Sequence, residues 1–271
     1  MSRVKRVYQY VLLYVYKFCG RIAADQVATN STWTNNHILE LWRRPQITKV
    51  IYPPVDTNDI MQAMPDLLKP RPNLMISFAQ FRPEKDHAMQ LRMWKRLLPR
   101  LPKDAKFWLV GTVRDENDQG ILDGLKDQAK VLGIEEFIDF KVNRSRQEIL
   151  DIFSQAKIAI HTMRNEHFGI AVVELMAAGI VTIAHKSAGP LFDIIGGTSK
   201  EVGYLAQSES DYEILAEQAF NGFNDLLYSF FVSSILGSFV RMLVSGSASD
   251  SVPRNSIRDS LSNLASASDD T

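Results

Sequence analysis

The chain has 271 residues, of which 45% are hydrophobic, and its 31 basic side chains are balanced by 31 acidic ones. The apolar content is sufficient for a folded core, whereas the balanced charge argues against a nucleic-acid-binding protein. A single cysteine, Cys19, excludes an intramolecular disulfide bond. The length fits one large domain or two small ones.

Apolar residues at helical spacing predict a helix over residues 4–18, which also carries basic residues and tyrosines. Such a helix could lie on a membrane surface, but we favour a core helix whose packing partner lies elsewhere. A short strand is expected over residues 25–29. Thr32 is the expected N-cap of a helix that continues through residues 36–42, and a second strand is expected over residues 49–52.

Prolines gather over residues 53–72 and predict a linker between two parts of the chain. Residues 1–52 precede it, and residues 73–219 follow it with alternating strands and helices. This alternation predicts an α/β fold with a Rossmann-like parallel sheet, covered by helices on both faces. The expected strands are 74–78, 107–110, 137–140, 158–160, 181–184 and 204–205, and the expected helices are 87–98, 120–132, 146–155 and 169–178, with a helical turn near 191–195.

The end of the chain departs from this alternation. Residues 220–244 contain a strongly apolar run, 226–240, which is shorter than the roughly 20 residues that a membrane-spanning helix needs. We expect a packed or interfacial helix there. Residues 245–271 are rich in serine and poor in aromatic side chains, a composition typical of disorder.

Candidate binding residues follow the first two strands of the expected sheet. Ligands of open parallel sheets bind beyond the carboxyl ends of the strands. Arg82 and Lys85 follow the strand 74–78, where cationic donors can bind phosphate oxygens. Gly111 follows the strand 107–110 and allows a close approach of the backbone. Taken alone, each of the two cations would more often be a solvated surface charge.

Two carboxylates, Glu166 and Glu174, are separated by seven residues around the start of a helix. The free N–H groups of Phe168, Gly169 and Ile170 at this helix start can bind an anion. Glu174 lies in an apolar run, where a carboxylate needs a hydrogen-bond partner. Glu166 could instead simply favour the positive end of the helix. No Asp-x-Asp pair occurs in the chain, so the usual signature of a metal-bridged sugar nucleotide is missing.

These motifs resemble the donor-binding motif of retaining glycosyltransferases with two Rossmann-like domains, the GT-B type. The paired glutamates carry the resemblance, together with the Phe81–Lys85 loop and the Ser187–Pro190 turn. Further segments are similar to the GDP-mannose-dependent α-1,2-mannosyltransferases of dolichol-linked oligosaccharide assembly, and the resemblance covers residues 1–219. These segments are 28–38, 52–56, 80–87 and 165–169.

The resemblance implies a donor-binding, C-terminal GT-B half at residues 73–219, preceded by a remnant of the acceptor domain at residues 1–52. It implies transfer of the fourth and fifth mannoses from GDP-mannose, with retention, to a dolichol-linked oligosaccharide at the cytosolic face of the endoplasmic reticulum membrane. No metal or other cofactor is expected. The implied catalytic residues are Glu166, Lys85 and Arg82, and the implied donor-binding residues are Arg82, Lys85, Gly111, Val142, Asn143, Glu166, Phe168, Gly169, Ile170 and Glu174.

The resemblance also implies a role for each group. Lys85, with Arg82 beside it, would bind the donor diphosphate, and Glu174 would bind the ribose. Glu166 and the N–H groups at the helix start would hold the mannose hydroxyls and the β-phosphate. Residues 142–143 would lie near the guanine.

Two alternatives stay open. A chain that lacks the acceptor domain could bind nucleotide or a partner without transferring sugar. The second alternative is a related transferase that uses a UDP-sugar, because the sequence does not identify the residues that recognise the base. The expected partners are GDP-mannose, the lipid-linked acceptor, a membrane and other mannosyltransferases of the same pathway, and no nucleic acid is expected.

Overall fold

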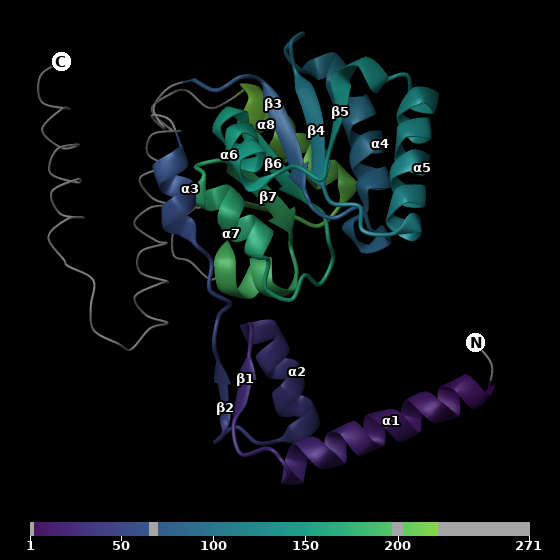
Figure 1. Cartoon of the computed structure of the whole chain (residues 1–271), viewed down its shortest axis with the longest axis vertical. Helices are drawn as coiled ribbons and strands as arrows, with labels where there is room; N and C mark the ends of the chain where they lie inside the picture. The colour runs from purple at the N-terminus through teal and green to yellow at the C-terminus, as the bar shows by residue number, and fades with distance from the viewer. Residues whose placement is uncertain (1–2, 65–69, 197–202, 222–271) are drawn as a thin grey trace, which may run out of the picture. The chain divides into compact units, whose positions relative to one another are not determined.

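The computed structural model describes residues 3–64, 70–196 and 203–221, and Figure 1 shows the arrangement of their helices and strands. A six-stranded sheet has the order β5-β4-β3-β6-β7-β8, and all neighbouring strands are parallel. This confirms the Rossmann-like parallel sheet. The strands are β3 (Leu74–Phe78), β4 (Lys106–Gly111), β5 (Ile138–Val142), β6 (Ile158–His161), β7 (Val181–His185) and β8 (Tyr204–Ala206).

The order of the strands reverses between β3 and β6. The chain passes outward from β3 through β4 to β5, then returns to place β6 on the other side of β3. Two loops that follow neighbouring strands therefore leave the sheet in opposite directions, and open α/β sheets bind their ligands at such a switch point. The loops after β3 and β6 are those that carry Lys85 and Glu166.

Helices cover both faces of the sheet (Figure 1), because the central strands are apolar on both sides. Helix α4 contacts α5 and α8 on one face, and α3 contacts α6 and α7 on the other. Sequence reasoning did not predict α8. The helices are α3 (Thr57–Ala63), α4 (His87–Leu97), α5 (Glu116–Leu132), α6 (Arg146–Gln155), α7 (Ile170–Ala177) and α8 (Glu209–Asn221).

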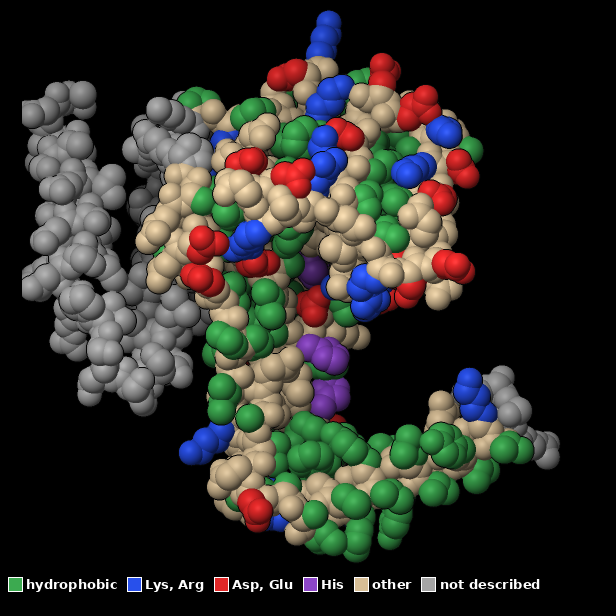
Figure 2. All heavy atoms as spheres, viewed as in Figure 1, with side chains coloured by type: hydrophobic (Ala, Val, Ile, Leu, Met, Phe, Trp, Pro, Cys, Tyr) green, Lys and Arg blue, Asp and Glu red, His purple; other side chains and the backbone are tan. Residues whose placement is uncertain are grey.

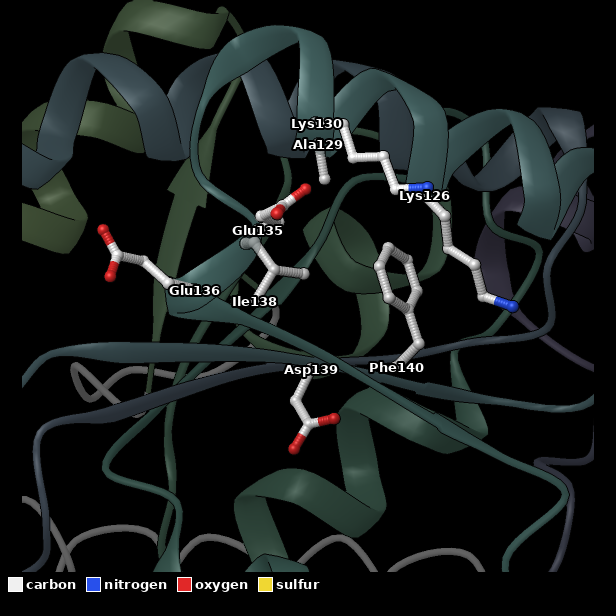
Figure 3. A pocket seen from close by; sticks show the side chains of 8 residues that line it. All are labelled: Lys126, Ala129, Lys130, Glu135, Glu136, Ile138, Asp139 and Phe140. Atoms are coloured by element: carbon white, nitrogen blue, oxygen red, sulfur yellow. The ribbon is translucent and has the colours of Figure 1, made fainter.

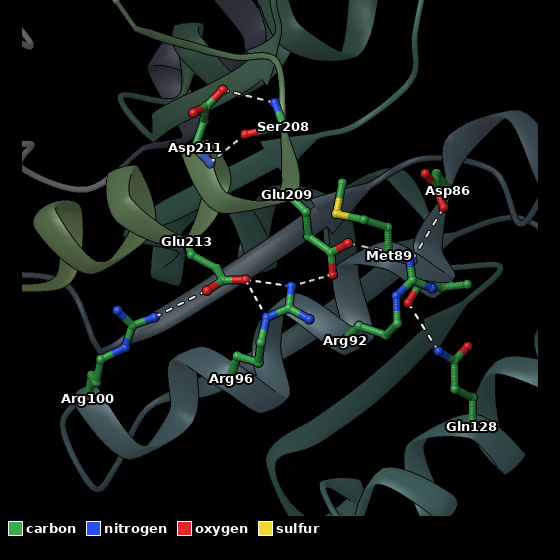
Figure 4. A network of polar contacts seen from close by, with 11 residues as sticks. Asp86, Met89, Arg92, Arg96, Arg100, Gln128, Ser208, Glu209, Asp211 and Glu213 are labelled. Carbon is green, nitrogen blue, oxygen red and sulfur yellow. Dashed lines mark hydrogen bonds and ion pairs between the residues drawn. The ribbon is translucent and has the colours of Figure 1, made fainter.

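Helix α8 is bound to α4 by a ladder of ion pairs (Figure 4). Three arginines spaced four residues apart, 92 and 96 on α4 and 100 in the 3₁₀ turn η2 (Leu98–Arg100) that follows it, pair with glutamates 209, 213 and 217 on α8. Residues four apart lie on one face of a helix, so the two rows can meet along their length. The pairs are partly exposed. Apolar contact is added by the ring of Trp94 on α4, which lies 6.2 Å from that of Phe220 on α8.

The N-terminal part consists of α1 (Arg3–Ile22), β1 (Val27–Thr29), α2 (Thr32–Trp42) and β2 (Thr48–Val50), with β1 and β2 paired in parallel. The expected N-cap was wrong by one position. Ser31 is the N-cap residue, and its side chain accepts a hydrogen bond from the N–H of Thr34, so α2 begins at Thr32 itself.

Helix α1 packs on α2 near its end and exposes most of its apolar side chains. The ring of Tyr16 lies 5.3 Å from that of Trp42, and a Cβ atom added to Gly20 would lie 2.1 Å from the same indole. Val7 and Val11 are 62% and 57% exposed, and Figure 2 shows apolar side chains along this helix. The favoured core-helix interpretation therefore has no support in the part of the chain that the structure describes. No helix there is both long and apolar enough to span a membrane.

Part of the predicted linker, residues 53–72, is helical. Asp56 caps α3 by accepting a hydrogen bond from the N–H of Asp59, and Ile60 is fully buried in the core of the Rossmann-like part. Prolines on either side of this helix produced the linker prediction. The predictions for residues 222–271, an apolar helix followed by a disordered tail, lie outside the described residues.

Candidate functional site

The loops after β3 and β6 meet at the switch point through an ion pair. Lys85 ends a short 3₁₀ turn, η1 (Pro83–Lys85), and its Nζ donates to Oε2 of Glu166 at 2.8 Å. The two side chains are 15% and 19% exposed, so the pair is largely shielded from water. The sequence placed both residues at one edge of the sheet, and the structure brings them into direct contact.

Glu166 has a second partner that sequence reasoning missed. Nε2 of His161 lies 3.3 Å from the same carboxylate oxygen. Burial alone would raise the pKa of Glu166, but the hydrogen bonds from His161 and Lys85 outweigh it and lower the pKa to about 2. Glu166 is therefore a carboxylate at neutral pH, an acceptor suited to hydroxyl groups.

Buried hydrogen bonds hold these groups in place. Thr162 Oγ1 donates to the backbone oxygen of Lys85 at 2.6 Å and accepts from Nε2 of Gln90 at 2.6 Å. The hydroxyl of Tyr212 donates to the backbone oxygen of His161 at 2.9 Å. Gln90 belongs to α4 and Tyr212 to α8, so these two helices hold the loops after β3 and β6 in place.

His87 begins α4 next to Lys85 and is almost completely buried. Burial, with the nearby charges of Lys85 and His161, lowers the pKa of His87 to about 4. Its ring packs 5.3 Å from that of Phe81 and is neutral at neutral pH. This imidazole therefore adds no positive charge to the site.

The start of α7 lies directly after Glu166. Gly169 is its N-cap with a φ of 111°, a conformation that favours glycine. The first N–H groups of a helix have no partner within it, so the start of α7 presents donors that can bind an anion. Phe168 is buried, whereas Ile170 is 46% exposed. The predicted anion-binding backbone thus lies beside the Lys85–Glu166 pair.

Glu174 lies one turn along α7, and its partner is a residue that sequence reasoning missed. Nη1 of Arg146 lies 3.1 Å from Oε1 of Glu174, and Arg146 also binds Asp59 at 3.2 Å. Burial raises the pKa of Glu174, and Arg146 opposes this shift. The expectation that this half-buried carboxylate needs a hydrogen-bond partner is confirmed.

Among the described residues, Arg82 makes no hydrogen bond or ion pair with Lys85 or Glu166. Its Nη1 lies 3.7 Å from Oε1 of Glu84, a local and partly exposed pair. The side chain is 30% exposed and lies in the loop after β3. Its predicted role beside Lys85 stays a prediction.

Val142 and Asn143, predicted to lie near the base, form one cluster with Gly111, which was predicted to bind the donor by close backbone approach. Gly111 pairs with Val142 across β4 and β5, and a Cβ atom at Gly111 would lie 2.0 Å from the backbone oxygen of Ala79. The side-chain amide of Asn143 makes two hydrogen bonds to the backbone of Val113. Its Oδ1 accepts from the N–H at 2.9 Å, and its Nδ2 donates to the carbonyl oxygen at 3.3 Å. Its amide therefore links the loop that follows β5 to the loop that follows β4.

A surface hollow of about 570 Å³ lies away from these groups, between α5 and the edge strand β5 (Figure 3). Its two lysines come from α5 and its two glutamates from the short 3₁₀ turn η3 (Glu135–Phe137), and it begins at the amino end of β5. Two strands, β4 and β3, separate β5 from the strand that precedes Glu166. The hollow is therefore separate from the candidate site. Its lining residues are Lys126, Ala129, Lys130, Glu135, Glu136, Ile138, Asp139 and Phe140.

Comparison with known families agrees with this geometry. Residues 60–219, more than half of the chain, match the family model of glycosyl transferases group 1. The chain belongs to this family. Residues 1–42 of this group 1 glycosyl transferase match a second model, described as the ALG11 mannosyltransferase N-terminus.

Two curated relatives of this glycosyl transferase are named GDP-Man:Man(3)GlcNAc(2)-PP-Dol alpha-1,2-mannosyltransferase. The protein from Homo sapiens is 39% identical over 218 residues, which cover 78% of this chain and 44% of the relative. The protein from Dictyostelium discoideum is 38% identical over 226 residues, again 78% of this chain and 44% of the relative. The resemblance drawn from the motifs is confirmed, and the chain spans less than half of the length of these relatives.

Among solved structures, this glycosyl transferase is similar to Anabaena Alr3699/HepE in complex with UDP and glucose. The TM-score is 0.60 at 20% sequence identity, over 86% of this chain and 66% of the other. At this identity the likeness concerns the fold, and it confirms the Rossmann-like architecture of a GT-B glycosyltransferase.

Proposed function

We propose that this chain binds GDP-mannose and takes part in transferring its mannose, in α-1,2 linkage and with retention, to a dolichol-linked oligosaccharide. The supporting observation is the shielded Lys85–Glu166 pair at the switch point, beside the start of α7. The names of the relatives support the choice of donor and acceptor. Because the chain spans less than half of those relatives, the activity of the whole enzyme is part of the proposal.

The residues would divide the donor between them. The ammonium group of Lys85 has three N–H donors. One binds Glu166 and one lies 2.9 Å from Sδ of Met163, so a third can bind a diphosphate oxygen. The negative charge that develops on the departing GDP would be stabilised by Lys85 and by the N–H groups at the start of α7. The ionised Glu166 would accept hydrogen bonds from mannose hydroxyls.

We further propose that donor binding is independent of metal ions, since Lys85 and the start of α7 supply positive charge to a diphosphate. Calorimetric titration of GDP in the presence of EDTA and then of Mg²⁺ tests this. Equal affinities in the two buffers support metal independence. A gain of about tenfold or more with Mg²⁺ contradicts it.

The exposed apolar side of α1 supports a location on a membrane surface, and we propose the cytosolic face of the endoplasmic reticulum. Residues 3–22 contain five basic residues and no acidic one, which suits an anionic lipid surface. Flotation with vesicles that contain phosphatidylserine should recover the chain, and Val11→Glu should reduce recovery. Val131→Glu is the matched control, because Val131 is 87% exposed on α5. Equal recovery of both variants would contradict the proposal.

Calorimetry with GDP, GDP-mannose and UDP-glucose, followed by a transfer assay on a lipid-linked acceptor, tests the main proposal. Binding of both guanine nucleotides together with transfer supports it. Binding without transfer would favour the non-catalytic alternative for this chain. Preference for UDP-glucose would indicate the UDP-sugar alternative, and a folded chain that binds no nucleotide would overturn the proposal.

A further inference from the structure

Asp193 is a buried carboxylate that joins the Rossmann-like part to the N-terminal part. It lies in a short π-helical turn, η4 (Pro190–Ile194), and is 7% exposed. Its two oxygens accept from the N–H of Thr32 at 2.9 and 3.1 Å, and one also accepts from the hydroxyl of Tyr52 at 3.0 Å. These partners lie 161 and 141 residues away in the sequence.

The contact with Thr32 is a charged cap on α2. Thr32 is the first residue of this helix, and its N–H has no partner within the helix. Ser31 already binds a later N–H, that of Thr34. A carboxylate at this end also interacts favourably with the helix dipole, so Asp193 adds a second, charged attachment to the start of α2.

Two ring contacts lie beside this attachment, and both involve residues that follow Glu166. Trp33 stacks on His167 with 5.0 Å between ring centres, and Tyr52 stacks on Phe168 at 5.4 Å. Tyr52 therefore binds Asp193 through its hydroxyl and Phe168 through its ring. The loop at 165–169 is held from the N-terminal part at two points.

The turn that carries Asp193 is itself packed on this loop through the backbone. The N–H of Gly189 donates to the backbone oxygen of Glu166 at 2.9 Å. A Cβ atom at Gly189 would lie 2.0 Å from the backbone oxygen of Phe168, so no larger residue fits there. Ser187 accepts from the N–H of Asn165 at 2.9 Å. A displacement of η4 must therefore move the loop of Glu166.

We propose that Asp193 is a positioning residue for Glu166, which holds the loop 165–169 in place by fixing η4 to α2 and Tyr52. Lys85 reaches the site from a different loop, after β3. Loss of the Asp193 contacts should therefore loosen Glu166 and the N–H groups at the start of α7, and leave Lys85 in place on the other side of the site. The ligand part of this inference rests on the proposed function, whereas the loop part does not.

Amide hydrogen exchange of the unliganded chain tests the loop part. Asp193→Asn keeps the shape of the side chain but removes its charge, and we expect exchange at residues 165–170 to rise about fivefold or more. Strand β4 should be unchanged. Asp123→Asn on the exposed side of α5 is the matched control and should leave residues 165–170 as in the wild type. Unchanged exchange there in a folded Asp193→Asn chain overturns the proposal.

A second variant decides the question if Asp193→Asn does not fold. Tyr52→Phe removes one hydrogen bond to Asp193 and keeps the ring on Phe168. Faster exchange at residues 165–170 in this variant supports the proposal. Exchange equal to that of the wild type overturns it.

Calorimetry tests the ligand part. In Asp193→Asn we expect GDP-mannose to bind about tenfold more weakly and GDP to lose less affinity, about threefold, because GDP keeps Lys85 and has no mannose for Glu166 to hold. Asp193→Glu, which keeps the charge, should recover part of the loss. Equal weakening of both ligands would contradict a role at the sugar side. If the wild type binds no nucleotide, the proposed function fails, and the exchange result still decides whether Asp193 positions the loop.

Discussion

Lys85 and Glu166 are 81 residues apart in the sequence, and their charged atoms lie 2.8 Å apart. The contact follows from the strand order, because Lys85 follows β3, Glu166 follows β6, and these strands are neighbours. A shielded ion pair is costly to separate, since each charge would be left with fewer partners away from water. A diphosphate that binds beside Lys85 meets a cation already held in position.

The ionisation of Glu166 should make stability depend on pH. The pKa of Glu166 lies at about 2 in the folded chain, below its ordinary value of 4.5. A carboxyl with a lowered pKa stabilises the fold above its unfolded pKa, and this contribution is lost as the pH falls through the folded pKa. As the pH falls from 4.5 to about 2, the wild type should lose about 2–3 kcal/mol of its unfolding free energy relative to Glu166→Gln. Urea unfolding at several pH values measures it, and an unchanged difference would show that the pKa of Glu166 is not lowered.

Glu174→Ala should weaken GDP and GDP-mannose by the same factor, because the predicted contact of Glu174 is with the ribose that both share. The partner left behind, Arg146, is 43% exposed and can be solvated. Truncation should therefore lower the melting temperature by no more than about 4 °C. Calorimetry and thermal melting measure the two effects, with Asp127→Ala as the control, because this carboxylate is 77% exposed on α5. If Glu174→Ala unfolds, the residue is structural.

The ladder between α4 and α8 should contribute a salt-dependent stability. Replacing Arg96 by Met removes pairs with Glu209 and Glu213 and should cost about 0.5–1 kcal/mol at low ionic strength. Screening should reduce this cost at about 1 M NaCl. The adjacent, exposed Lys95→Met is the matched control in urea unfolding. A cost for Arg96→Met that does not change with salt would mean that packing of the side chain, rather than charge, holds α8.

The sequence predicted the sheet well where apolar runs are short and bounded by turn residues. Strand β3 and helix α6 have the predicted bounds, and β6 and β7 differ by one residue at their ends. Helix α8 was missed because it is held largely by tertiary contacts. Its glutamates pair with arginines more than 100 residues earlier, and a sequence pattern does not show which charges will meet.

The sequence predicted some residues of the site and missed those whose role depends on distant contacts. The rule that ligands bind at the carboxyl ends of parallel strands placed Lys85 and Glu166 at one edge. His161 ends β6 at the same edge, but the rule does not show that its ring will contact Glu166. Arg146 and Asp193 act through partners on distant elements. Such contacts depend on the fold, so spacing along the chain could not identify them.

Titration of GDP-mannose into wild type, Lys85→Met and Lys126→Met chains tests the central claim, that the switch-point pair forms a sugar-nucleotide site. A charge-assisted hydrogen bond contributes about 1.5–3 kcal/mol, so Lys85→Met should weaken binding by about tenfold to a hundredfold. Lys126 lies by the separate hollow and pairs with Asp123, so its replacement should leave the affinity unchanged. Saturable binding by the wild type and Lys126→Met, with a clear loss in Lys85→Met, is the predicted result. Equal affinity of all three chains would contradict the account.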